Sequence, residues 1–170
     1  VSGGTLSGTK AFVAEGDSAT LFVVAASDGL YLVESSASGV ARSRRHMADF
    51  RSHAEISFSN APAEKLANGG DALLDDVLDR ARIITAAEMF GMTSAAFDTT
   101  LAYLKQRVQF GQILATFQAL QHRMANLFGD IELTRSVLET ALVAIDSGGD
   151  TRSAAVLAKT RANDTLHLMS

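Results

Sequence analysis

The sequence predicts an α+β fold, in which a small antiparallel β-sheet or barrel domain is followed by an up-down helical bundle. Two observations carry this prediction. The spacing of apolar residues changes near residue 70, from the alternation of strands to the three- to four-residue repeat of amphipathic helices. Eight of the 13 glycines precede residue 71, and the one proline is Pro62. Long helices explain the scarcity of proline, which is strongly unfavourable inside a helix.

The first predicted domain, residues 1–65, consists of short strands separated by turn residues. Apolar or alternating segments predict strands over residues 10–14, 19–26, 30–33 and 55–59. Residues 27–29 (Ser-Asp-Gly) are typical of a hairpin turn. The polar segment 42–46 fits either an edge strand or a loop. Short strands at this spacing favour a small antiparallel sheet or barrel.

The second predicted domain, residues 70–170, contains three helices. The first runs to about residue 108. Its predicted buried stripe is Leu74, Val77, Leu78, Ala81, Ile84, Ala87 (or Glu88), Gly91 and Ala95, continuing through Leu101 and Leu104. A second stripe runs over residues 117–145 and ends before Gly148, and a third follows Asp150 with alanines on its inner face. We expect three helices of a four-helix bundle, with an apolar groove left for a fourth helix or a partner.

Composition excludes several classes of function. With 15 Lys+Arg and 19 Asp+Glu the net charge is −4, which argues against nucleic acid as the main partner. The absence of cysteine fits a reducing compartment, and we expect a cytoplasmic protein. No apolar run is long enough to span a membrane. The four histidines lack metal-ligand spacing, so no metal site is predicted. The basic cluster Arg42, Arg44 and Arg45 is interpreted as a solvated edge.

Residues 107–122 place an arginine before a Phe-Gly break and the start of a new helix. A guanidinium suits phosphate oxygens, and the first N–H groups of a helix attract anions. The side-chain amide of Gln118 can hydrogen-bond a nucleotide edge or a ribose. This segment therefore predicts an anion site. Pattern alone favours the alternative, in which Arg107 caps its own helix and Phe110 and Phe117 pack in the core.

The same segment resembles a known family. Its run Arg-x-Gln-Phe-Gly, followed by Phe-Gln-x-x-Gln-His, closely resembles the C-terminal helical domain of acyl-CoA dehydrogenases. Residues 82–91 and 155–159 are also similar to that domain. Residues 6–13 and 54–58 resemble strands of the family's central β-domain. The resemblance covers nearly the whole chain and suggests a fragment: the central β-domain plus part of the C-terminal bundle, without the N-terminal helical domain.

The resemblance implies FAD as cofactor and an oligomer, typically a homotetramer. It implies that the FAD of a neighbouring subunit is contacted by Arg107, Gln109, Phe110, Phe117 and Gln118. It also implies that the isoalloxazine ring is lined by Phe12, Val13 and Ala14. Ala14 departs from a common Thr or Ser, so one side-chain hydrogen bond to the flavin is expected to be absent.

The implied reaction oxidises an acyl-CoA thioester to the 2,3-enoyl-CoA, by α-proton abstraction and β-hydride transfer to flavin, in fatty acid metabolism. Electron-transfer flavoprotein or a similar acceptor is the implied electron partner. Asp79 and Arg82 stand where the family's first bundle helix meets acyl-CoA. Pattern alone favours a surface i,i+3 ion pair for these two residues.

No catalytic residue is predicted within the chain. The reaction needs a carboxylate base near the substrate α-carbon. Most family members carry this Glu in a segment that would follow Ser170, and a minority carry it where this chain has Ala81. We therefore expect the 170 residues alone to be inactive. Two alternatives stay open: a non-catalytic flavin-binding partner subunit of a hetero-oligomer, and a related flavoenzyme such as an acyl-CoA oxidase or nitroalkane oxidase.

Overall fold

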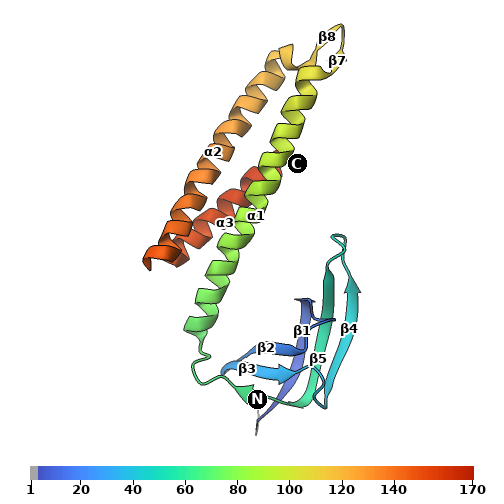
Figure 1. The fold of residues 1–170 in the computed structure, drawn as a ribbon, viewed down its shortest axis with the longest axis vertical. Helices are drawn as coiled ribbons and strands as arrows, with labels where there is room; N and C mark the ends of the chain where they lie inside the picture. The colour runs from blue at the N-terminus through green and yellow to red at the C-terminus, as the bar shows by residue number, and fades with distance from the viewer. Residues whose placement is uncertain (1–3) are drawn as a thin grey trace. The chain divides into compact units, whose positions relative to one another are not determined.

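The computed structural model describes residues 4–170, so residues 1–3 of the first predicted domain lie outside the described part. The chain divides into two compact units, Val1–Asp75 and Asp76–Ser170. Antiparallel strands make up the first unit and three helices dominate the second (Figure 1). The α+β fold class predicted from the sequence is confirmed.

Two antiparallel three-stranded sheets form the first unit. Their strands are β1 (Thr5–Ala14), β2 (Leu21–Ala26), β3 (Gly29–Glu34), β4 (Val40–His46), β5 (Ser52–Pro62) and β6 (Glu64–Lys65). The strand orders are β1-β5-β4 and β2-β3-β6, and among the described residues the two sheets do not close into a barrel. The polar segment 42–46, which the sequence left open, belongs to edge strand β4.

Strand β5 gives the β1-β5-β4 sheet two chemically different faces. Ala54, Ile56 and Phe58 are buried in the core of the first unit, where the Phe58 ring meets Phe22 edge to face with centroids 6.3 Å apart. Because side chains alternate along a strand, residues 53, 55 and 57 lie on the opposite, outward face. The 3.5 Å contact between the Thr9 and Ser57 hydroxyls lies on that face.

A β-bulge interrupts the pairing of β1 with β5. Lys10 is opposite Ile56, whereas Val13 is opposite Ala54, so β1 has one residue more than β5 between these two pairs. Phe12 lies in the bulge with φ of +53° and leaves 64% of its side chain exposed. The bulge therefore turns an aromatic ring outward near the end of β1.

A polar cluster joins β6, the last strand of the first unit, to β3 and to the turn before β3. The buried Tyr31 donates its hydroxyl hydrogen to Asp28 at 2.8 Å, and the Lys65 ammonium lies 3.3 Å from the same carboxylate oxygen. The Tyr31 hydrogen bond lowers the pKa of Asp28. The hydrogen bonds to Asp28 raise the pKa values of Tyr31 and Lys65. With the 2.8 Å bond from Leu30 N–H to the Gly69 carbonyl, this cluster fixes the path of the chain toward the first helix.

The second unit contains α1 (Asp71–Gln106), α2 (Gln118–Ser147) and α3 (Thr151–Met169). Helix α2 ends at Gly148, which adopts the left-handed conformation at φ of +67°. The Asp150 carboxylate caps α3 by accepting the Ser153 N–H at 3.0 Å, and contacts with Ser153 lower the pKa of Asp150. No helix within residues 4–170 combines the length and the apolar character needed to cross a bilayer.

Small residues allow α2 and α3 to pack closely, and α1 contributes side chains to the same buried cluster. The main buried cluster of this unit contains Ile83, Ala86, Leu138, Ala141, Ala155, Ala158 and Ala162, which confirms the predicted alanine stripe of α3. A polar layer joins α2 to α3: the buried Thr134 and Thr165 hydroxyls lie 2.8 Å apart, and Arg161 donates to Asp130 at 2.5 Å.

The predicted buried stripe of α1 is wrong over most of its length, and only its continuation at Leu104 is buried. The buried residues of α1 are Asp79, Ile83, Ala86, Thr93, Phe97 and Leu104. The predicted residues Val77, Leu78, Ala81, Ile84, Gly91 and Ala95 are exposed, and Leu74 and Ala87 are half-buried. Apolar side chains surround much of α1, so periodicity alone could not decide which face packs against α2 and α3. We call the exposed residues Val77, Leu78, Ala81 and Ile84 the second apolar face of α1.

We expect Ala158→Leu to lower the free energy of unfolding by about 1–3 kcal/mol, because three extra carbons must fit where only 2% of the alanine is exposed. Urea unfolding followed by far-UV circular dichroism measures the effect. Leu157→Ala is the matched control, since 57% of Leu157 is exposed and its loss should change stability by less than about 0.5 kcal/mol. Equal effects of the two substitutions would contradict the packing described here.

Candidate functional site

A two-residue hairpin connects α1 to α2 at one end of the helical unit (Figure 1). Strands β7 (Val108–Gln109) and β8 (Gln112–Ile113) pair with each other, and a short 3₁₀ turn, η1 (Leu114–Thr116), leads into α2. Phe110 and Gly111 have φ of +54° and +80°, as a type I′ turn requires at both central positions. The chain break here was predictable from the sequence, but the hairpin was not.

The two phenylalanines of the motif pack against each other at the surface. Their rings meet edge to face, with centroids 6.2 Å apart and an interplanar angle of 88°. Phe110 is 90% exposed, so the alternative in which it packs in the core is wrong. A bulky residue at positive φ is strained, and here the strained residue presents its ring to the outside.

Arg107 and the start of α2 lie at the base of the same hairpin. The Arg107 carbonyl accepts the Leu114 N–H at 2.8 Å, which closes the hairpin. The Arg107 guanidinium is exposed and has no partner among residues 4–170. Phe117 is the N-cap of α2 and provides no side-chain hydrogen bond, so within the described chain the N–H groups of Gln118 and Ala119 are also unpaired.

The hairpin end therefore combines groups that suit an anionic dinucleotide. A free guanidinium and the first N–H groups of a 30-residue helix can hold phosphate oxygens. The exposed Phe110 ring can stack on a base. Gln109 and Gln118 are both exposed and offer amides for hydrogen bonding. The structure thus brings together at one hairpin end the five residues that the resemblance assigned to the FAD of a neighbouring subunit.

The other predicted flavin residues lie at the end of β1. Phe12 and Ala14 are exposed, whereas Val13 packs partly against the β-core. A Cβ on Gly16 would come within 3.0 Å of the Val13 carbonyl oxygen and 3.2 Å of the Ala54 methyl, so a larger residue would require these neighbours to shift by a few tenths of an ångström. Two side chains of the predicted trio are therefore available to a ligand, and the third serves mainly the core.

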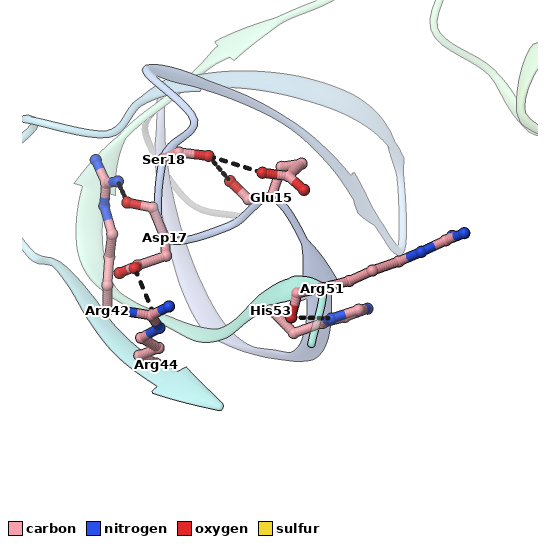
Figure 2. A network of polar contacts seen from close by, with 7 residues as sticks. All are labelled: Glu15, Asp17, Ser18, Arg42, Arg44, Arg51 and His53. Carbon is pink, nitrogen blue, oxygen red and sulfur yellow. Dashed lines mark hydrogen bonds and ion pairs between the residues drawn. The ribbon is translucent and has the colours of Figure 1, made fainter. Parts of the chain in front are cut away.

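A polar network surrounds the turn after β1 (Figure 2). Arg42 donates to the Asp17 carbonyl at 2.8 Å, and the Arg44 guanidinium lies 3.7 Å from the Asp17 carboxylate. Ser18 donates to Glu15 at 3.0 Å. Arg45 is paired with Glu55 on β5 at 2.6 Å. Each arginine of the basic cluster thus has a partner within the chain, which agrees with its interpretation as a solvated edge.

Asp79 and Arg82 form a hydrogen-bonded ion pair on α1, but not a surface pair. The Asp79 side chain is 6% exposed and that of Arg82 is 42% exposed. The sequence analysis missed this burial because it assigned the wrong face of α1 to the core. A rise of about 1.5 Å per helical residue puts this pair roughly 40 Å from Arg107. The pair and the hairpin end are therefore two separate sites of the helical unit.

No cluster of three or more His, Cys, Asp or Glu side chains that could hold a metal ion occurs within residues 4–170. The predicted site residues thus fall into three groups: the hairpin end, the end of β1, and the Asp79–Arg82 pair. The end of β1 belongs to the first unit and the other two groups to the second.

Comparison with known proteins identifies the helical half. The family described as "Acyl-CoA dehydrogenase, C-terminal domain" matches residues 68–169. Acyl-CoA dehydrogenase IpdE2 of Mycolicibacterium smegmatis is 39% identical over 88 residues, covering 52% of this chain and 27% of the relative. The short-chain specific acyl-CoA dehydrogenase of Megasphaera elsdenii is 29% identical over 177 residues, covering 94% of this chain and 46% of the relative.

The similarity to solved structures extends over both halves. A structure named Tcur3481-Tcur3483 steroid ACAD superimposes with a TM-score of 0.87 at 34% identity, covering 99% of this chain and 48% of that one. The chain thus spans about half the length, or less, of the relatives that it matches.

We expect Arg82→Ala to lower the free energy of unfolding by about 1–3 kcal/mol, because it leaves the buried Asp79 carboxylate without its charged partner. Arg80→Ala is the matched control: Arg80 pairs with Asp76 at 2.9 Å, and both side chains are about half exposed, so its loss should cost less than about 0.5 kcal/mol. Urea unfolding of the two variants measures both changes in the free energy of unfolding. Equal stabilities would show that Asp79 does not depend on Arg82.

Proposed function

Since the chain belongs to the acyl-CoA dehydrogenase family, we propose that it is part of an FAD-dependent enzyme that oxidises an acyl-CoA thioester to the 2,3-enoyl-CoA. The observation that carries this proposal is the presence, at one hairpin end, of the exposed and unpaired Arg107 guanidinium and the unpaired N–H groups at the start of α2, within the segment that matches the family. Such a group of donors suits a dinucleotide pyrophosphate.

FAD, when bound, supplies the acceptor for the hydride from the substrate β-carbon. In our proposal this chain contributes binding and orientation. Arg107 and the start of α2 hold the pyrophosphate, and the amides of Gln109 and Gln118, with the Phe110 and Phe117 rings, contact the adenine end. Phe12 and Ala14 border the isoalloxazine ring, and Val13 supports the strand from the core side.

The substrate is proposed to meet α1 near Asp79 and Arg82. The buried Asp79 holds one side of the Arg82 guanidinium, so Arg82 is fixed in orientation while part of it stays accessible for polar groups of acyl-CoA. Ala81 has no acidic group, and we assign the α-proton to no carboxylate of this chain. The base is proposed to come from a segment outside these 170 residues.

Assembly is proposed on the second apolar face of α1. Val77 is 52% exposed and Ile84 is 68% exposed, and neighbouring apolar side chains of this kind are typical of surfaces buried by a partner. We propose a homotetramer in which the FAD is shared between subunits. On the sequence grounds given above, we also propose that electron-transfer flavoprotein or a similar protein accepts the electrons. We further propose a role in fatty acid metabolism and a cytoplasmic location.

A non-catalytic flavin-binding subunit of a hetero-oligomer is the second candidate. One observation favours it: the similar steroid ACAD has a two-part name, Tcur3481-Tcur3483. The complete reading frame distinguishes the two candidates. A glutamate in the segment after residue 170, at the position that closes the bundle over the substrate, supports the enzyme.

We expect Arg107→Ala to raise the dissociation constant for FAD about 10- to 100-fold, because a charged hydrogen bond to phosphate contributes about 1.5–3 kcal/mol. Fluorescence quenching of FAD by the protein from the complete reading frame measures the change. Lys105→Ala removes an exposed positive charge from the last turn of α1 and serves as control. If both variants bound FAD with the same affinity, the assignment of Arg107 would be wrong.

We further expect acyl-CoA to bleach the visible flavin band of the protein from the complete reading frame, and to drive dye reduction. The purified 170-residue chain with added FAD should show no turnover, because it lacks a base. Turnover by the 170 residues alone would overturn the placement of the base. A complete protein that binds FAD but is never reduced by any acyl-CoA would favour the non-catalytic subunit.

A further inference from the structure

His53 lies directly across the sheet from Ala14. The two residues are paired in the antiparallel register of β1 and β5, and Val13 is paired with Ala54 in the core. Ala14 and His53 therefore share the outward face, where directly opposed Cβ atoms lie about 4.5–5.5 Å apart. Because Ala14 has only a methyl group, the space beside the His53 imidazole is not filled from β1.

The charges around His53 leave one of its ring nitrogens available. Its Nδ1 lies 3.3 Å from the Arg51 carbonyl oxygen (Figure 2). Arg45, which is opposite His53 on β4, is paired with the Glu55 carboxylate, and the Glu15 carboxylate accepts from Ser18. No contact of Nε2 occurs among residues 4–170. The imidazole is thus oriented by Arg51, with Nε2 left free.

The bulge places an aromatic ring on the same end of β1. Residues 11 and 12 together oppose Glu55, so the exposed Phe12 ring, the Ala14 methyl and the His53 imidazole border one patch. This patch borders the Arg45–Glu55 ion pair on the same face. It offers an aromatic ring, a methyl group and an unpaired ring nitrogen, which suit a flat heteroaromatic ring that has hydrogen-bonding atoms along one edge.

On the proposed function, on which this step rests, we infer that His53 is a further cofactor-contacting residue, which hydrogen-bonds the edge of the flavin ring through Nε2. With Nδ1–H donated to Arg51, a neutral imidazole accepts a hydrogen bond at Nε2 and an imidazolium donates one. The flavin edge carries both an N–H donor and carbonyl acceptors, so either protonation state finds a partner there. Because Ala14 has only a methyl group, it leaves the space in which the hydrogen bond between His53 and the flavin forms.

The test uses FAD-loaded protein from the complete reading frame. His53→Leu should raise the dissociation constant for FAD about three- to tenfold, the loss expected for one hydrogen bond, and should shift the visible absorption band of the flavin. His53→Gln, which keeps polar atoms, should lie between His53→Leu and the unaltered protein. In NMR spectra of histidine-labelled protein, FAD should shift the imidazole signals of His53.

His46→Leu is the matched control. His46 lies in the same β4–β5 hairpin and is opposite Ser52, on the face of the sheet opposite to that of His53. Its substitution should leave FAD affinity and the flavin spectrum unchanged, and FAD should not shift its imidazole signals. Normal affinity and spectrum in His53→Leu, together with unshifted His53 signals, would overturn the inference and leave the proposed function intact. Failure of the unaltered protein to bind FAD would overturn both.

Discussion

Reversal of the chain at Phe110–Gly111 is the constraint on which the helical unit depends. A 36-residue helix and a 30-residue helix can lie antiparallel only if the chain turns back within a few residues. The turn does so with two successive left-handed residues and is closed by the bond between Arg107 and Leu114. The same turn leaves the exposed Arg107 after the carboxyl end of α1, with the positive end of α2 close by in the chain, so the geometry that folds the bundle also places the residues proposed to hold an anion.

In the first unit, strand β5 likewise contributes side chains to both the core and the surface. Alternation along β5 buries Ala54 and Ile56 and turns His53 to the opposite face. The bulge in β1 interrupts the regular pairing with β5 and exposes Phe12. Gly16 then allows the chain to leave the strand against the core without a clash. Exposed and core-facing groups thus alternate within a few residues.

The sequence predicted the fold class because each half has a clear period. Strand positions and the alanine stripe of α3 were predictable for the same reason. The buried face of α1 was not, since apolar residues surround that helix and only contacts with α2 and α3 select Ile83 over Ile84. The burial of Asp79 was missed through that error. The β7–β8 hairpin was missed because its first turn residue is Phe110, and phenylalanine is not a usual signal for a left-handed turn. The sequence could not place His53 opposite Ala14, because this pairing depends on the register of β1 against β5, which the β-bulge shifts by one residue.

The polar layer between α2 and α3 fixes the position of α3 along α2. Thr134 meets Thr165, and Asp130 meets Arg161, one helical turn apart. Sliding α3 by one turn would keep alanine against apolar neighbours, so the apolar packing alone tolerates several alignments. The same slide would separate the Thr134 and Thr165 hydroxyls and break the ion pair between the half-buried Asp130 and Arg161, a cost that an alanine surface alone does not impose. Substitutions at these four positions should therefore be tolerated as exchanged pairs rather than singly, which makes the layer a starting point for redesigning which helix α2 accepts as its neighbour.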